Sequence, residues 1–202
     1  MKGLQFSGAM AVAVRNGTKT QTRRTSGLHH VNGADYDLVG VDGAFATFAR
    51  RDELGTRVTV KCRYAPGERL CLLASWAVSR EFDDLKPTAL PAHIAGSGRI
   101  WHAGLGISKP AWAGKSRPPR SLTNPLRALV PQFKLESVRV ERLQAITEAD
   151  ARAEGVVSDG GGERVGPIEG YRAVWDSINA DSGHGWATNP WAWVITFGLT
   201  DA

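Results

Sequence analysis

The chain is poor in cysteine, with only Cys62 and Cys71 among 202 residues. Two thiols are too few for the disulfide framework of a small secreted domain, and too few for a cysteine zinc cluster. Both are expected to be buried strand residues in a reducing compartment. Apolar runs such as Leu70 to Ala74 are far too short to cross a bilayer, and the first residues lack the apolar core of a signal peptide. The sequence therefore predicts a cytoplasmic protein that does not enter a membrane.

Histidine is also scarce, with five in the chain. Neither His29-His30 nor His184 has a third ligand at metal spacing, so we expect no metal and no cofactor. The remaining composition, 42% hydrophobic and 22% charged, is that of an ordinary globular protein. A length of 202 residues fits a single domain over residues 1–202. The oligomeric state cannot be deduced from these features.

The formal charge of +5 is unevenly distributed along the chain. Residues 1–24 contain five basic and no acidic side chains, and residues 115–142 contain seven basic and two acidic ones. This distribution favours one positive face suited to phosphate, and the partner we expect is a modified nucleoside or nucleic acid. The alternative is that folding scatters these charges over the surface.

Hydrophobic patterning predicts an α+β fold in which strands outnumber helices. Pro66-Gly67 is expected to form a turn, and a bulge is expected near Ser137. The expected strands are residues 2–6, 39–50 and 57–64 as a hairpin, 70–76, 133–143 and 191–199, and the expected helices are residues 9–16, 147–153 and 171–179. In the strand over 57–64, one face is apolar and the other is basic. The glycine-rich stretch 159–162 lacks the flanking strand and helix of a phosphate loop, so it reads as a connector.

Residues 81–132 contain seven prolines, which exclude long regular elements. We interpret this segment as an irregular insertion with one short strand at 99–102. It is either a lid over a pocket or a surface decoration. The basic run Lys115 to Arg120 inside it favours the lid.

The stretch Gly17-Thr-Lys-Thr-Gln-Thr-Arg-Arg24 concentrates three basic side chains and three threonine hydroxyls in eight residues. Ser7 is a candidate helix N-cap before it, and Gly17 stands where a helix ends. The octapeptide is therefore expected to be a surface loop after a helix. Without further information it is equally well a solvated basic turn leading into a strand.

The same octapeptide resembles the signature of the ASCH family, a branch of the PUA-like superfamily. It is most similar to phage and prophage members with the pattern Phe-Ser-x-x-Met followed by Gly-x-Lys-Thr-x-Thr-Arg-Arg. The other matching blocks are Pro66-Gly-Glu-Arg-Leu70 with Trp76, Val138 to Gln144 leading into Ile146 to Gly155, and Trp175 to Asn179 with Asn189-Pro-Trp191. The resemblance implies a small, partly open β-barrel flanked by short helices.

The family includes amidohydrolases that deacetylate N4-acetylcytidine, and the resemblance places their catalytic roles on Lys19, Thr22 and Glu154. A threonine hydroxyl needs a neighbouring base, and a lysine crowded by Arg23 and Arg24 would have a lowered pKa suited to that task. Glu154 would protonate the leaving nitrogen or hold Lys19. Each residue also has a plain alternative: Lys19 contacts phosphate, Thr22 begins a strand, and Glu154 decorates a helix end.

Arg23 and Arg24 are the predicted anion-binding residues, since a guanidinium can grip a phosphate or a base carbonyl through two donors. Trp76 is a candidate base-stacking platform, although a tryptophan at such a position is more often core. Three functional hypotheses follow. The first is a metal-free hydrolase of an acylated pyrimidine nucleoside, free or within nucleic acid. The others are a non-catalytic module that binds RNA or a modified base, and a ribonuclease.

Overall fold

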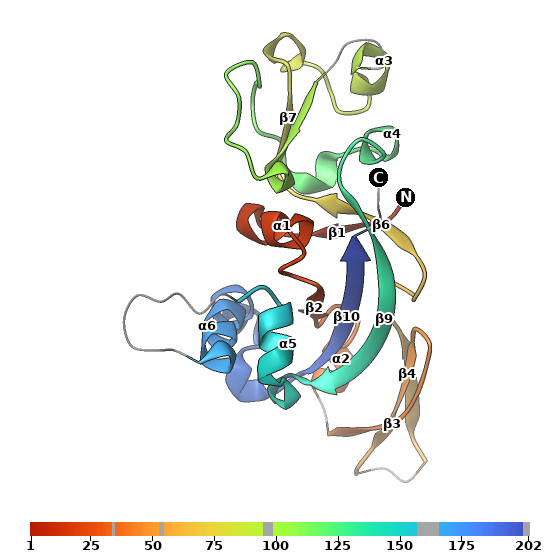
Figure 1. Ribbon diagram of the computed structural model, residues 1–202. Helices are drawn as coiled ribbons and strands as arrows, with labels where there is room; N and C mark the ends of the chain where they lie inside the picture. The colour runs from red at the N-terminus through yellow and green to blue at the C-terminus, as the bar shows by residue number, and fades with distance from the viewer. Residues whose placement is uncertain (34, 53–54, 95–98, 157–165, 200–202) are drawn as a thin grey trace. The chain divides into compact units, whose positions relative to one another are not determined.

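The computed structural model describes residues 1–33, 35–52, 55–94, 99–156 and 166–199 and has an α+β architecture (Figure 1). The strands are β1 (Gly3–Gln5), β2 (Gln21–Arg24), β3 (Tyr36–Asp42), β4 (Phe45–Arg50), β5 (Arg57–Lys61), β6 (Arg69–Leu73), β7 (Trp76–Val78), β8 (Ile100–His102), β9 (Gln132–Arg142) and β10 (Trp191–Leu199). The helices are α1 (Gly8–Arg15), α2 (His29–Asn32), α3 (Leu90–Ile94), α4 (Asn124–Arg127), α5 (Glu148–Ala153) and α6 (Pro167–Asn179). Among these residues the strands form open sheets without a closed barrel. No helix in the described ranges is long and apolar enough to span a membrane.

The chain divides into two compact units that interleave along the sequence. The first unit contains Met1–Gly17 and Arg69–Lys134 with Leu199, and the second contains Thr18–Glu68 and Leu135–Gly198. Strand β9 contributes its first residues to the first unit and the rest to the second. Both units are therefore built from segments that lie far apart in the sequence.

In the first unit, β6 is the middle strand between β1 and β9. β1 runs parallel to β6, with Leu4 opposite Leu72, and β9 runs antiparallel to it, with Phe133 opposite Leu70. Helix α1 begins after Ser7, whose hydroxyl accepts a hydrogen bond from the Met10 amide, as the sequence predicts. The chain leaves α1 through Gly17, which has a φ of 74°.

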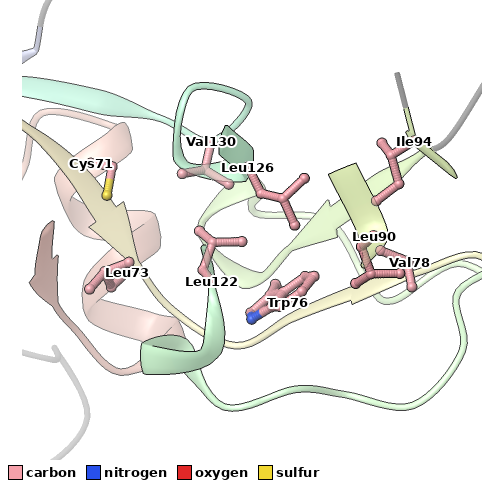
Figure 2. Packing of buried hydrophobic residues seen from close by; sticks show 9 residues of the cluster. All are labelled: Cys71, Leu73, Trp76, Val78, Leu90, Ile94, Leu122, Leu126 and Val130. Carbon is pink, nitrogen blue, oxygen red and sulfur yellow. The ribbon is translucent and has the colours of Figure 1, made fainter. Parts of the chain in front are cut away.

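A separate hydrophobic core fills the first unit, and Figure 2 shows its side chains converging. The predicted strand over 70–76 is in fact two strands, β6 and β7, because the chain breaks between Leu73 and Trp76. The segment 81–132 does contain the expected short strand, β8. It also supplies five of the nine residues of the core, which consists of Cys71, Leu73, Trp76, Val78, Leu90, Ile94, Leu122, Leu126 and Val130. A segment that contributes five core residues is part of the packed unit and not a surface decoration.

In the second unit, β10 pairs antiparallel with β2, and β3, β4 and β5 form a three-stranded antiparallel sheet. The prediction of one strand over 39–50 is wrong. Asp42-Gly43 turns the chain there, with Gly43 at a φ of 54°, and Asp-Gly is a strong hairpin signal that the strand assignment overlooks. The expected turn at Pro66-Gly67 is present, with Gly67 at a φ of 85°.

Helices α5 and α6 pack together against one face of β10, while β4 lies against the other. Ala192 faces the helices within a cluster that includes Tyr171 and Trp175. Trp191, the preceding residue, meets the Phe48 ring edge-on, with 5.4 Å between the centroids. This alternation follows from the period of two along a strand, and it gives β10 two buried faces.

Several other sequence predictions are confirmed. Strand β10 has the predicted bounds, and two consecutive exposed residues, Glu136 and Ser137, mark the expected change of phase in β9. Cys62 and Cys71 are buried, and these two thiols form no disulfide. Helix α6 begins at Pro167, four residues earlier than predicted. The stretch 159–162 lies outside the described residues.

Candidate functional site

The octapeptide 17–24 is not a surface loop. Its last four residues are β2, and Lys19, Gln21, Thr22 and Arg23 are all buried. The prediction failed because these side chains are polar, and a polar run with glycine in front is typical of a loop. Burial is possible here because the charged side chains find partners of opposite charge in the fold.

Backbone contacts place Lys19 beside Glu154, 135 residues later in the chain. The two residues form an isolated antiparallel bridge, and the Thr20 amide donates to the Ala153 carbonyl at 2.9 Å. Residues directly opposite in an antiparallel pair project their side chains to the same side. The bridge therefore directs the Lys19 amine and the Glu154 carboxylate toward one another.

The position of Glu154 is set by helix α5. Thr147 and Asp150 form the predicted capping box at its start, so the helix begins at a defined residue. Glu154 is the C-cap residue, and Gly155 follows with a φ of 81°. A glycine accepts this left-handed conformation without penalty, which ends the helix with Glu154 at the bridge.

Lys19, Arg23 and Glu154 form a buried ionic cluster. The Lys19 Nζ donates to Glu154 Oε2 at 2.8 Å and to the Glu154 carbonyl at 2.6 Å. The Arg23 Nη1 donates to the other carboxylate oxygen, Oε1, at 3.3 Å. Lys19 and Glu154 are only 5% and 4% exposed. Both oxygens of Glu154 are thus engaged by cations within the protein.

Arg23 extends this cluster to two further carboxylates. Its Nη2 lies 3.2 Å from Glu141 Oε2 and 3.4 Å from Asp150 Oδ2, and its guanidinium lies over the Tyr171 ring. The side chain is completely buried. Arg23 therefore holds β2, β9 and α5 together through carboxylates of its own chain, and its role as an anion-binding residue stays a prediction.

Burial dominates the electrostatics of Lys19. It lowers the pKa of the lysine, and the neighbouring Arg24 and Arg23 lower it further. The charge of Glu154 and its hydrogen bond act in the opposite direction without cancelling the effect. Lys19 therefore loses its proton at a lower pH than an ordinary lysine, which is the property that a lysine base requires.

Thr22 and Arg24 lie on the face of β2 opposite to Arg23, because side chains alternate along a strand. In the register with β10, Thr22 is opposite Ile195 and Arg24 is opposite Trp193. The Thr22 hydroxyl forms no hydrogen bond with any described residue. Arg24 is nevertheless close enough for the charge of Glu154 to raise its pKa, against the larger lowering by burial. The structure thus brings Lys19 and Glu154 together with Arg24 near them, and among the described residues Thr22 shares no hydrogen bond with any of the three.

Trp76 belongs to the core of the first unit and not to this cluster. Its ring is fully buried, and its Nε1 donates to the Pro118 carbonyl and to Ser121 Oγ, both at 3.1 Å (Figure 2). The Arg117 guanidinium lies over the ring at 5.5 Å. A base cannot stack on a ring that is covered in this way, so the core interpretation holds for Trp76.

The sequence interpretation missed three members of the cluster, namely Arg139, Glu141 and Asp150. Arg139 donates to Glu141 and to Asp150, and its side chain is more exposed than that of Arg23. A signal for two of them is the alternation in Val138-Arg-Val-Glu-Arg142, which puts Arg139 and Glu141 on one face of a strand.

With Arg24, the group contains four cations, Lys19, Arg23, Arg24 and Arg139, against three carboxylates. With Lys19 protonated, the group therefore retains one positive charge that can attract an anion or a carbonyl oxygen.

Comparison of the chain with models of protein families, with curated proteins and with solved structures gives no match. The similarity to the ASCH signature therefore rests on the residues of the motif blocks alone.

Proposed function

We propose that the chain is a metal-free amidohydrolase that removes an acyl group from a modified pyrimidine nucleoside such as N4-acetylcytidine. The observation that carries this proposal is the buried pair of Lys19 and Glu154, with 2.8 Å between Nζ and Oε2. These are two of the three residues to which the ASCH resemblance assigns catalysis. The PUA-like fold is part of the same proposal. The open sheets and short helices agree with the α+β class of that fold, and they do not distinguish it from other α+β folds.

The chemistry requires one proton acceptor and one proton donor. Lys19 in its neutral form takes the proton of the attacking oxygen as that oxygen bonds to the acyl carbon. The negative charge that develops on the carbonyl oxygen is stabilised by Arg24. The bond from the acyl carbon to N4 then breaks, and the proton held by the Lys19–Glu154 pair passes to the departing nitrogen. Water supplies the oxygen of the released acetate and the balancing proton.

Turnover of N4-acetylcytidine tests the proposal directly. The protein is incubated with the nucleoside, and cytidine and acetate are quantified by chromatography. We expect Lys19→Met and Glu154→Gln to reduce kcat at least about 100-fold, the usual contribution of a positioned acid or base. The matched control is Lys86→Met, which removes an exposed lysine of the first unit. Absence of turnover by the parent protein would refute the proposal.

Thr22 requires its own test because its hydroxyl does not contact Lys19 in this structure. If Thr22 is the nucleophile, Thr22→Val abolishes turnover and Thr22→Ser retains part of it. If water attacks directly, both variants retain turnover. A burst of cytidine release before steady state would support a covalent acyl intermediate on Thr22.

The second candidate function is binding of a modified base or RNA without catalysis. The placement of Thr22 favours it, since this residue shares no hydrogen bond with the ionic cluster. Retention of N4-acetylcytidine in equilibrium dialysis, combined with no release of acetate, would establish this function in place of the first. We place either function in the cytoplasm, or the host cytoplasm if a phage encodes the chain.

A further inference from the structure

The three-stranded sheet β3-β4-β5 has one buried face and one exposed face. Ala46, Phe48 and Val60 are buried on the inner face. The outer face carries Phe45 opposite Lys61, Thr47 opposite Thr59, and Ala49 opposite Arg57. None of these outer residues is buried, and Phe45, Thr59, Lys61 and Arg57 are exposed.

Positive charge is concentrated along β5, at the edge of this sheet. Arg57 and Lys61 project outward, and Arg63 follows in the same alternation and is also exposed. No acidic residue interrupts residues 57–64. Within the described ranges, neither Arg57 nor Lys61 forms an ion pair. With a rise of about 3.4 Å per residue, these three cations span roughly 20 Å.

The acidic residues of the sheet lie on the opposite edge strand. Asp37 and Asp42 belong to β3, and Asp37 is already paired with Arg51. Two strand spacings of about 4.8 Å separate β3 from β5, which is close to the Debye length in physiological salt. Between them lies β4, which is uncharged from Phe45 to Ala49 and ends in Arg50, a residue paired with Asp52. The acidic edge therefore leaves the potential along β5 positive.

An exposed aromatic ring accompanies these charges. Phe45 is 42% exposed, and the Lys61 Nζ lies 5.1 Å from the centroid of its ring. The Thr47 and Thr59 hydroxyls lie beside it, 3.0 Å apart. Cations that follow a backbone beside an aromatic ring on which a base can stack are the usual features of a single-strand binding surface.

The row of cations leads toward the ionic cluster of the same unit. The Arg63 guanidinium lies 5.8 Å from the Tyr64 ring centroid, and Tyr64 in turn interacts electrostatically with Arg24. In the proposed hydrolysis, Arg24 stabilises the negative charge that develops on the carbonyl oxygen of the acyl group. A strand bound along β5 would therefore extend toward Arg24.

We propose that the outer face of β4 and β5 binds a single-stranded polynucleotide, with Arg57, Lys61 and Arg63 on its phosphates and Phe45 under one base. For the hydrolase, and resting on that proposed function, the preferred substrate is then an acylated nucleotide inside a strand, and the free nucleoside is turned over as its smaller analogue. An anionic membrane is a less suitable partner, because a row of cations beside one aromatic ring matches a single strand better than a plane of headgroups.

Binding is measured by fluorescence anisotropy with a labelled oligouridine and a labelled oligothymidine, over a range of salt concentrations. Each phosphate contact to a single strand contributes about 0.7 to the slope of log affinity against log salt. The double variant Arg57→Gln/Lys61→Gln should thus reduce the slope by about 1.4 and the affinity at 0.1 M salt by roughly 25-fold. Phe45→Thr should weaken binding at least about fivefold and leave the slope unchanged.

The matched control is Arg152→Gln/Arg172→Gln, which removes the same charge from exposed arginines that are paired with Glu148 and Asp176. This control should bind like the parent protein. The proposal would be overturned if both double variants lost the same affinity. It would also be overturned if the parent protein bound no oligonucleotide, or if it bound phosphatidylserine vesicles in place of oligonucleotides.

Failure of this inference can be distinguished from failure of the hydrolase proposal. Anisotropy needs no turnover, so it decides the binding surface even if the protein is not an enzyme. If the protein is a hydrolase, Arg57→Gln/Lys61→Gln should leave kcat/KM for free N4-acetylcytidine unchanged and raise KM for an acetylated oligonucleotide. An equal effect on both substrates would contradict the inference.

Discussion

At the scale of single residues, we expect the loss of the Glu154 carboxylate to destabilise the protein more than the loss of the Lys19 amine. Glu154→Gln leaves Lys19 and Arg23 buried without their shared carboxylate, and should lower the free energy of unfolding by about 3–5 kcal/mol. Lys19→Met leaves Glu154 paired with Arg23 and should cost only about 1–2 kcal/mol. Urea unfolding of both variants measures the difference. Equal losses would show that Lys19 and Arg23 do not share the carboxylate.

The Asp150 carboxyl makes the free energy of unfolding depend on pH in the acidic range. Burial raises its pKa, but hydrogen bonds from the amide and hydroxyl of Thr147 and the charge of Arg23 outweigh this, so that its pKa is lowered to about 2. A lowered pKa in the folded state contributes stability that is complete above the ordinary value near 3.8 and is lost as the pH falls toward 2. We expect this loss to be about 1–2 kcal/mol.

The measurement is urea unfolding of the parent and of Asp150→Asn between pH 5 and pH 2. The parent should lose more stability than the variant over this interval. The control is Asp42→Asn, which changes an exposed carboxylate without a described ion pair and should behave like the parent. Parallel curves for the parent and Asp150→Asn would contradict the assignment.

Residue chemistry explains why the site was only partly predictable. The resemblance of the motif to ASCH proteins singled out Lys19 and Glu154, and their side chains do meet. It could not show that Arg23 is buried among Glu141, Asp150 and Glu154, because all three partners lie more than 100 residues away. An arginine that binds carboxylates of its own chain looks, in sequence, the same as one that binds a ligand.

At the scale of secondary-structure elements, the end of α5 controls the position of Glu154. Gly155 has a φ of 81°, and a Cβ placed on it would lie 3.0 Å from the Cβ of Lys19. Gly155→Ala should therefore strain the backbone and also displace Lys19, lowering the free energy of unfolding by about 2–3 kcal/mol. Turnover of N4-acetylcytidine should fall with it.

Gly183→Ala is the matched control for this change. Gly183 has a similar φ of 78°, but a Cβ there would meet no atom within 4 Å. This variant should lose only the cost of the left-handed conformation, about 1 kcal/mol, and should keep its turnover. If both variants lose the same stability, contact with Lys19 is not important.

The elements also differ in how well the sequence predicted them. Helices α1 and α5 were recognised because Ser7 and Thr147 provide local N-caps, and β10 because apolar residues alternate along it. Strand β2 is predicted only as an alternative, with Thr22 at the start of a strand, because Gln21-Thr-Arg-Arg24 has no apolar alternation. Its burial depends on carboxylates from β9 and α5, and such tertiary contacts override local propensity.

At the scale of the whole molecule, the described residues form two compact units with separate cores, and the sequence prediction of one domain with an insertion stays a prediction. The prolines of residues 81–132 exclude long helices and strands, but they do not prevent the segment from packing into a core. Leu90, Leu122 and Leu126 are fully or almost fully buried in the first-unit core (Figure 2). Proline content therefore predicted the irregular backbone of this segment correctly and gave no information about its burial.

The two cores predict that stability and the proposed activity can be changed separately. Leu126→Ala creates a cavity in the first unit and should lower the free energy of unfolding by about 2–5 kcal/mol. The described residues of the ionic cluster all belong to the second unit, so kcat per folded molecule should be unchanged. The fraction folded is measured by circular dichroism under the assay conditions, and kcat is divided by it. A fall in the corrected kcat would mean that the first unit takes part in the reaction, because loss of packing alone acts only through the fraction of molecules that are folded.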